Sequence, residues 1–107
     1  MYQYKELYTI DFTNVQHYLE MHFIIRQAMD WPDYYGCNWS AFWDCLTNMT
    51  GRPVHIEIIG LDVIERKFDD AAEKMISILN RFKHYSKEFA TDVEVSVVNG
   101  NIRTRIV

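Results

Sequence analysis

The stretch WPDYYGCNWSAFWDCLT, residues 31–47, is the most informative part of this chain of 107 residues. It contains all three tryptophans of the sequence. An apolar helix face begins in it, with side chains that recur at steps of three and four residues at positions 39, 42, 43, 46 and 49. This spacing predicts a short helix that runs from Asn38 and is closed by Gly51 and Pro53.

Asp44 is the only formal charge between Tyr34 and Gly51. Tryptophan and tyrosine dominate the energetic centres of protein interfaces, and a carboxylate among them would pair strongly with an Arg or Lys of a partner. The same spacing is also typical of a helix that packs its aromatic face into the core and leaves Ser40 and Asp44 on the solvated side. The residues alone therefore leave an interface and a purely structural role open.

The flanking sequence predicts alternating strands and helices, because apolar residues recur there with a period of two or at helical spacing. The helix after the first strand is expected to end at residues 30–33, since the residue before a proline leaves helical geometry. The expected elements are a strand over 8–12, a helix from an Asn14 cap through Gln27 or beyond, the helix from Asn38, a strand over 54–58, a helical turn over 63–68, a long helix over 72–82 and a C-terminal hairpin.

The hairpin is predicted from Asn99-Gly100, which lies between two alternating apolar runs and is typical of a type I′ turn. A two-residue turn at these positions sets the register of the two strands. The expected pairs are Val97 with Ile102, Val95 with Thr104, Val93 with Ile106, Glu94 with Arg105 and Ser96 with Arg103.

Helices between strands favour a parallel sheet with right-handed crossovers, and the hairpin adds an antiparallel strand at one edge. The fold class expected is therefore α/β, a small layered arrangement in a single domain over residues 1–107. Hydrophobic residues make up 49% of the chain and charged residues 24%, a balance typical of globular proteins.

The charge balance argues against a nucleic-acid partner and suits a protein that mimics a polyanion or binds a basic partner. Eleven Lys and Arg face fifteen Asp and Glu, and no basic patch or tail is visible for phosphate neutralisation. No signal peptide is visible at the N-terminus, and no apolar run approaches the roughly 18 residues that span a bilayer. We therefore expect a cytoplasmic protein with no membrane contact, whose two cysteines are reduced.

Enzyme chemistry finds little support in the residue spacing. Cys37 and Cys45 do not form a Cys-x-x-Cys pair, and no clear activating base lies beside either of them in sequence. The sequence contains no phosphate-binding glycine loop and no serine elbow. The four histidines, His17, His22, His55 and His84, do not have the spacing of metal ligands. No catalytic residue, metal or cofactor is expected. A hydrolase or redox enzyme that uses Cys37 is the least favoured of the hypotheses considered.

A family resemblance separates these alternatives. The run WPDYYG at 31–36, then Asn38 and Ala41, and then WDCLT at 43–47, resembles the barstar family of intracellular inhibitors of secreted ribonucleases. The resemblance implies a three-stranded parallel sheet with helices. It also implies that the second helix and the loop before it block a ribonuclease active site without forming a covalent bond.

The resemblance also implies a set of partner-binding residues. Asp44 matches the carboxylate that takes the place of a substrate phosphate among the cationic groups of the enzyme. Ser40 occupies a contact position at which the family prototype has an acid. The expected partner-binding residues are Tyr34, Tyr35, Gly36, Asn38, Trp39, Ser40, Trp43 and Asp44.

Departures from the family pattern bear on the identity of the partner. The prototype also has acids where this chain has Cys37 and Asn80 or Arg81, and it lacks the C-terminal hairpin. Charge pairs set specificity, so the expected partner is a barnase-like ribonuclease with a differently charged site. The alternative is an interaction module whose partner is not a ribonuclease. A monomer is favoured.

Overall fold

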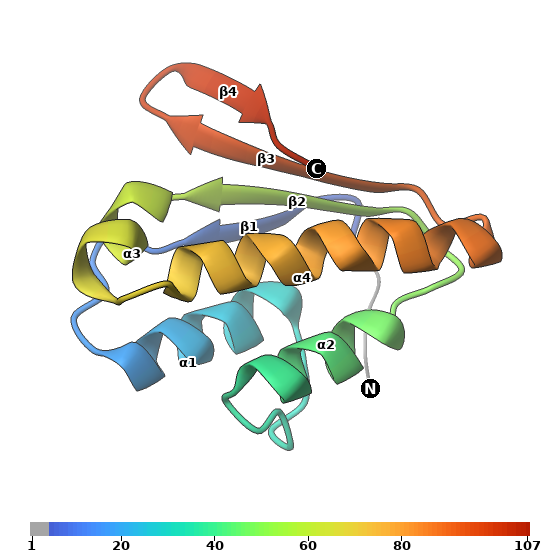
Figure 1. Ribbon diagram of the computed structural model, residues 1–107, viewed down its shortest axis with the longest axis horizontal. Helices are drawn as coiled ribbons and strands as arrows, with labels where there is room; N and C mark the ends of the chain where they lie inside the picture. Colours follow the sequence, from blue (N-terminus) through green and yellow to red (C-terminus); the bar gives the residue numbers. More distant parts are fainter. Residues whose placement is uncertain (1–4) are drawn as a thin grey trace.

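The computed structural model describes residues 5–107 (Figure 1). Residues 1–4 lie outside the described residues. The prediction that no signal peptide is present and the predicted domain over 1–107 both include them. The elements in chain order are β1 (Tyr8–Asp11), α1 (Tyr18–Met29), α2 (Trp39–Thr47), β2 (Val54–Ile59), α3 (Leu61–Lys67), α4 (Ala71–Ser86), the 3-10 turn η1 (Lys87–Phe89), β3 (Val93–Asn99) and β4 (Ile102–Arg105).

The strands form one sheet in the order β1-β2-β3-β4. β1, β2 and β3 are parallel, and β4 pairs with β3 in the antiparallel sense. The predicted fold class is therefore confirmed. Figure 1 shows α1, α2 and α4 gathered beside the sheet, with the β3–β4 hairpin at its far edge.

Alternating burial divides the sheet into two faces. Tyr8, Ile56 and Val95 pair across β1, β2 and β3 and are buried, because this inner face packs against the helices. The neighbouring side chains point the other way. We call that side the outer face, and its members include Thr9, Asp11, His55, Glu57, Glu94, Arg103 and Arg105.

The predicted hairpin forms, but its predicted register is wrong. Asn99 pairs with Ile102 and Ser96 pairs with Arg105, so the turn residues are Gly100 and Asn101. Gly100 has a φ of 64°, whereas Asn99 and Asn101 keep negative φ. A glycine with positive φ at the first turn position is the arrangement of a type II′ turn, which moves the turn one residue along the chain. The strand partners shift by two, so every side chain keeps its predicted face.

The first helix begins later than predicted. Its cap is His17 and not Asn14, because the Glu20 carboxylate accepts from the backbone N–H of Gln16 (2.6 Å) and of His17 (3.4 Å). α1 ends at Met29, as predicted, and Asp30 follows in the left-handed conformation with a φ of 58°. α4 is longer than predicted, since it begins at Ala71 and ends at Ser86.

Gly60 is the glycine on which the packing of the β2–α3 junction depends. Its φ is 80°, and a Cβ there would lie 2.8 Å from the backbone nitrogen of Thr13. Only glycine allows this close approach between the end of β2 and the segment after β1. None of the helices over residues 5–107 combines the length and the apolar character needed to cross a membrane.

Candidate protein-binding site

The loop between α1 and α2 is fixed to the end of α1. The Trp31 N–H donates to the carbonyl of Arg26 (3.0 Å), and the Arg26 guanidinium pairs with the Asp33 carboxylate at 2.7 Å. Within the loop, the Tyr35 N–H donates to the carbonyl of Pro32 (3.1 Å). The loop therefore has a defined conformation before any partner binds.

Tyr35 points into the protein, beneath this loop. It is 4% exposed, and its hydroxyl lies 2.7 Å from Nδ1 of His22, a fully buried residue of α1. The rings of Trp31 and Tyr35 are 5.2 Å apart, and those of His22 and Trp39 are 4.8 Å apart. Of the residues expected to bind a partner, Tyr35 is thus the one that the structure places in the core.

His22 is held in its neutral form by burial, which lowers its pKa from 6.5 to about 4. Burial also raises the pKa of Tyr35, so its phenol keeps its proton and can donate to Nδ1 of His22. Nε2 of His22 has no hydrogen-bond partner within residues 5–107. A buried hydrogen bond between two neutral groups thus adds to the contacts that hold the loop against α1.

Asn38 starts α2 at the end of the loop. Its Oδ1 accepts from the Ala41 N–H (2.8 Å), and its Nδ2 donates to the carbonyl of Gly36 (3.1 Å). Cys37, just before it, has a φ of 52°, in the left-handed region. The tight turn at residues 36–38 fixes the direction of α2 relative to the loop.

Five of the predicted partner-binding residues are exposed: Tyr34, Gly36, Asn38, Ser40 and Asp44. Tyr34 is the most exposed large side chain here, at 76%. Trp39 and Trp43 are half-buried, so each offers an edge to the surface. The Asp44 carboxylate makes no hydrogen bond or ion pair with any residue in 5–107, and it stands one helical turn from Ser40.

A groove runs between α2 and α4, and we call it the α2–α4 groove. One part has a volume of about 340 Å³ and the adjoining part about 410 Å³; Trp39 and Ile78 line both. The Arg81 guanidinium lies 4.2 Å from the ring centroid of Trp43, in a cation–π contact. The first part is lined by Trp39, Ser40, Trp43, Asp44, Ile78 and Arg81.

The sequence model of the family described as Barstar (barnase inhibitor) matches residues 6–98. The chain belongs to the barstar family. A protein of Bacillus subtilis (strain 168) named "Putative ribonuclease inhibitor YrdF" is 26% identical over 78 residues, which are 73% of this chain and 82% of that protein. The family match ends at Val98, so the hairpin turn and β4 lie beyond it.

The sequence pointed to only one part of the α4 side of this groove, where Asn80 or Arg81 is aligned with an acid of the family prototype. Ile78 lies on α4, and the apolar pattern of that helix does not predict whether its side chain faces α2 or solvent. Tyr85 and Phe89 extend the aromatic row that begins at Trp43, with ring centroids 5.5 and 5.1 Å apart along it. They lie more than forty residues further along the chain, so only the packing of α4 against α2 brings them to Trp43.

The two cysteines are free. Cys45 is buried, and its burial together with the nearby charge of Asp44 raises the pKa of its thiol. A raised pKa is the opposite of what a nucleophilic thiol needs. The half-buried Cys37 thiol donates to the carbonyl of Tyr35 (3.8 Å), and within residues 5–107 no base contacts it.

A group of side chains that could hold a metal lies elsewhere, on the outer face of the sheet. It consists of His55, Asp92 and Glu94. The group lies on the face of the sheet that is turned away from the helices, whereas α2 and α4 line the groove, so the two sites are separate surfaces of the molecule.

Proposed function

We propose that this barstar-family protein is a non-covalent inhibitor of a secreted microbial ribonuclease and that it blocks the active site with the loop and helix over residues 34–44. The observation that carries the proposal is the Asp44 carboxylate. It is exposed, has no partner within residues 5–107, and stands beside two half-buried tryptophans on a helix.

The chemistry of ribonucleases explains why such a carboxylate would bind. An enzyme that cleaves RNA holds a phosphate with cationic groups, and a carboxylate can take the place of that phosphate. Trp39 and Trp43 flank Asp44 and would exclude water from the contact, which strengthens a charge pair. Because α2 and the loop already have their conformation, little ordering entropy is lost on binding.

The groove around Asp44 bears on which ribonuclease is bound. Asp44 and Arg81 line the same part of it, one acidic and one basic, and Ser40 adds no charge. A partner that fits must offer a cation to Asp44 and an acceptor, a carboxylate or a carbonyl, to Arg81. We propose a barnase-like enzyme whose active-site rim is less uniformly basic than that of barnase.

The biological setting is part of the same proposal. A protein that neutralises a secreted ribonuclease protects the cell that makes the enzyme, so we place this chain in the bacterial cytoplasm as an immunity protein. It acts as a monomer and catalyses no reaction. The raised pKa of the Cys45 thiol and the lack of a base near Cys37 both argue against a thiol enzyme.

A second candidate function is an interaction module whose partner is not a ribonuclease. It is favoured by Arg81, whose guanidinium covers part of the Trp43 ring and places a positive charge at the groove. In a pull-down from cell extract, capture of one protein that is not a nuclease by the parent, and its loss with Asp44→Asn, would support this second function.

The proposal is tested by titrating the protein into a panel of barnase-type microbial ribonucleases while RNA cleavage is followed. Asp44→Asn is measured alongside the parent, and Glu65→Gln on α3 is the matched control because it removes one charge from an exposed, unpaired carboxylate. Stoichiometric inhibition that Asp44→Asn loses and Glu65→Gln keeps is the expected result. Equal inhibition by parent and Asp44→Asn would contradict the assigned site, and no inhibition of any enzyme would favour the second function.

A further inference from the structure

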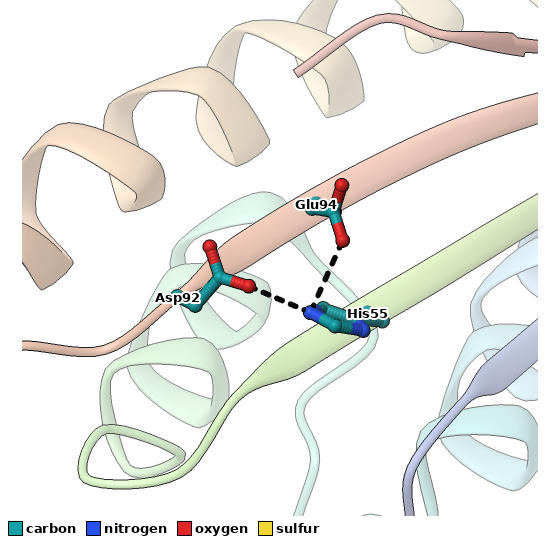
Figure 2. A group of neighbouring side chains, drawn as sticks. All are labelled: His55, Asp92 and Glu94. Atoms are coloured by element: carbon teal, nitrogen blue, oxygen red, sulfur yellow. Dashed lines mark hydrogen bonds and ion pairs between the residues drawn. The ribbon is translucent and has the colours of Figure 1, made fainter.

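Three metal-ligating side chains converge on the outer face of the sheet. Figure 2 shows the Nε2 atom of His55 pointing between two carboxylates. It lies 2.9 Å from Oδ2 of Asp92 and 3.3 Å from Oε2 of Glu94. One ligand atom from each of the three side chains lies within 4.8 Å of the other two.

The parallel pairing of β2 and β3 creates this convergence. His55 on β2 is directly opposite Glu94 on β3, and Asp92 is two residues before Glu94, so all three point to the same side. The Val54 N–H donates to the carbonyl of Asp92 at 2.8 Å and fixes that residue against β2. Two of the three residues therefore lie on paired strands, and Asp92, the residue just before β3, is held to β2 by this hydrogen bond.

We propose that His55, Asp92 and Glu94 form a binding site for a divalent transition-metal ion, with Zn²⁺ as the representative ion. Zinc takes one imidazole nitrogen and two carboxylate oxygens readily, with water in the fourth position of a tetrahedron. Bonds of about 2.1 Å place tetrahedral ligand atoms about 3.4 Å apart. The two distances from Nε2 are within about half an ångström of that value, and the carboxylate oxygens lie within 4.8 Å of each other, so small side-chain rotations would complete the site.

All three side chains are partly exposed, which leaves room for small rotations. His55, Asp92 and Glu94 have side-chain exposures of 32%, 62% and 37%. The imidazole ligand selects zinc or a similar transition metal over Mg²⁺, which prefers oxygen ligands and keeps its water.

Arg105 orients one of the ligands. Its guanidinium pairs with Oε1 of Glu94 at 2.9 Å, and this leaves Oε2 toward His55. Nε of Arg105 donates to the carbonyl of Val107 (3.0 Å), so the arginine is itself held. Groups that hold a ligating carboxylate in this way tune metal affinity in many proteins.

A metal at this site would tie β2 to the start of β3 without covering the α2–α4 groove. Its expected effect is on stability, because an ion that binds the folded state and not the unfolded chain raises the melting temperature. This inference does not rest on the proposed inhibitor function.

The test is titration calorimetry of Zn²⁺ into the tag-free full chain, with Cys37→Ser as the parent so that the half-buried thiol does not compete. One equivalent of Zn²⁺ should bind and raise the melting temperature, and Mg²⁺ at the same concentration should not. His55→Gln, Asp92→Asn and Glu94→Gln should each weaken binding by about tenfold or more. Circular dichroism checks that each variant is folded.

The matched control is His84→Gln, which removes an exposed histidine on α4 and should leave zinc affinity unchanged. Absence of saturable binding would overturn the site. Retained affinity in His55→Gln, or an effect of His55→Gln that neither carboxylate variant shares, would overturn it as well. Stabilisation by Mg²⁺ equal to that by Zn²⁺ would overturn the choice of a transition metal.

Discussion

The α2 surface and the outer face of the sheet differ in whether their carboxylates are paired. On the outer face, Glu57 pairs with Arg103 at 3.7 Å and Glu94 pairs with Arg105 at 2.9 Å. On α2, the Asp44 carboxylate has no partner within residues 5–107, and the nearby Arg81 rests on an aromatic ring.

The comparison separates charges that are paired within the fold from a charge that has no partner within residues 5–107. A carboxylate paired in the free protein must give up that pair to bind an arginine or lysine of another protein, so it gains little from the exchange. An unpaired carboxylate loses only water. The α2 surface is thus better prepared for charge-assisted binding than the outer face, although both carry acids.

The largest expected effect comes from reversing one charge on each surface. Asp44→Lys should weaken inhibition of the target ribonuclease by about a thousandfold, because it sets like charges against each other at the centre of the contact. Glu94→Lys raises the net charge by the same amount and should leave inhibition near that of the parent. Inhibition constants from RNA cleavage measure both, and equal losses would mean that net charge and not position decides binding.

Acid should lower the free energy of unfolding through His22, the buried histidine that contacts Tyr35 of the α1–α2 loop. The unfolded chain takes up a proton on His22 as the pH falls below 6.5, whereas the folded protein resists until about pH 4. Stability present at neutral pH is therefore lost across this window, by up to about 3 kcal/mol at its lower end. Denaturant unfolding at several pH values should show the loss, and His22→Gln should flatten it. An unchanged pH dependence in His22→Gln would contradict the buried neutral histidine.

Tyr35→Phe should separate support of the loop from contact with the partner. The variant leaves Nδ1 of His22 without its hydrogen bond, and we expect a loss of about 1–2 kcal/mol in unfolding free energy. Because the Tyr35 side chain is buried, inhibition by the folded variant should stay close to that of the parent. Strong loss of inhibition with unchanged stability would place the Tyr35 hydroxyl in the interface.

The smallest effect is expected on the outer face. Glu57→Gln breaks a pair at 3.7 Å with a partner that is more than half exposed, and such pairs contribute about 1 kcal/mol or less. Thermal unfolding at low and high salt should show a small difference that shrinks as salt is added. A loss of inhibition in this variant would break the division between the two surfaces.

The sequence predicted the elements better than their junctions. Strong periodicity gave the strands and α2, and the alternation of helices and strands gave the parallel sheet. The predicted start of α1 was wrong because the Glu20 side chain caps the helix at His17. The predicted hairpin register was wrong because Gly100 occupies the first turn position. Both outcomes depend on single hydrogen bonds or backbone angles that periodicity does not resolve.

The site shows the same limit. Helical spacing did not decide whether Asp44 is exposed, and only the family resemblance implied it. The inward direction of Tyr35 depends on His22, thirteen residues away. Ile78 and the group at His55 and Glu94 depend on contacts between elements distant in sequence. Such juxtapositions follow from tertiary packing and strand register, which local patterns do not specify.

The most direct test of the proposed function is competition at the active site of a ribonuclease that the titration has found to be inhibited. Affinity of the protein for the enzyme is measured at increasing concentrations of a nucleotide that occupies the catalytic site. If α2 and its loop fill that site, the apparent dissociation constant should rise in proportion to the nucleotide concentration. Unchanged affinity, with nucleotide and protein bound together, would contradict the account.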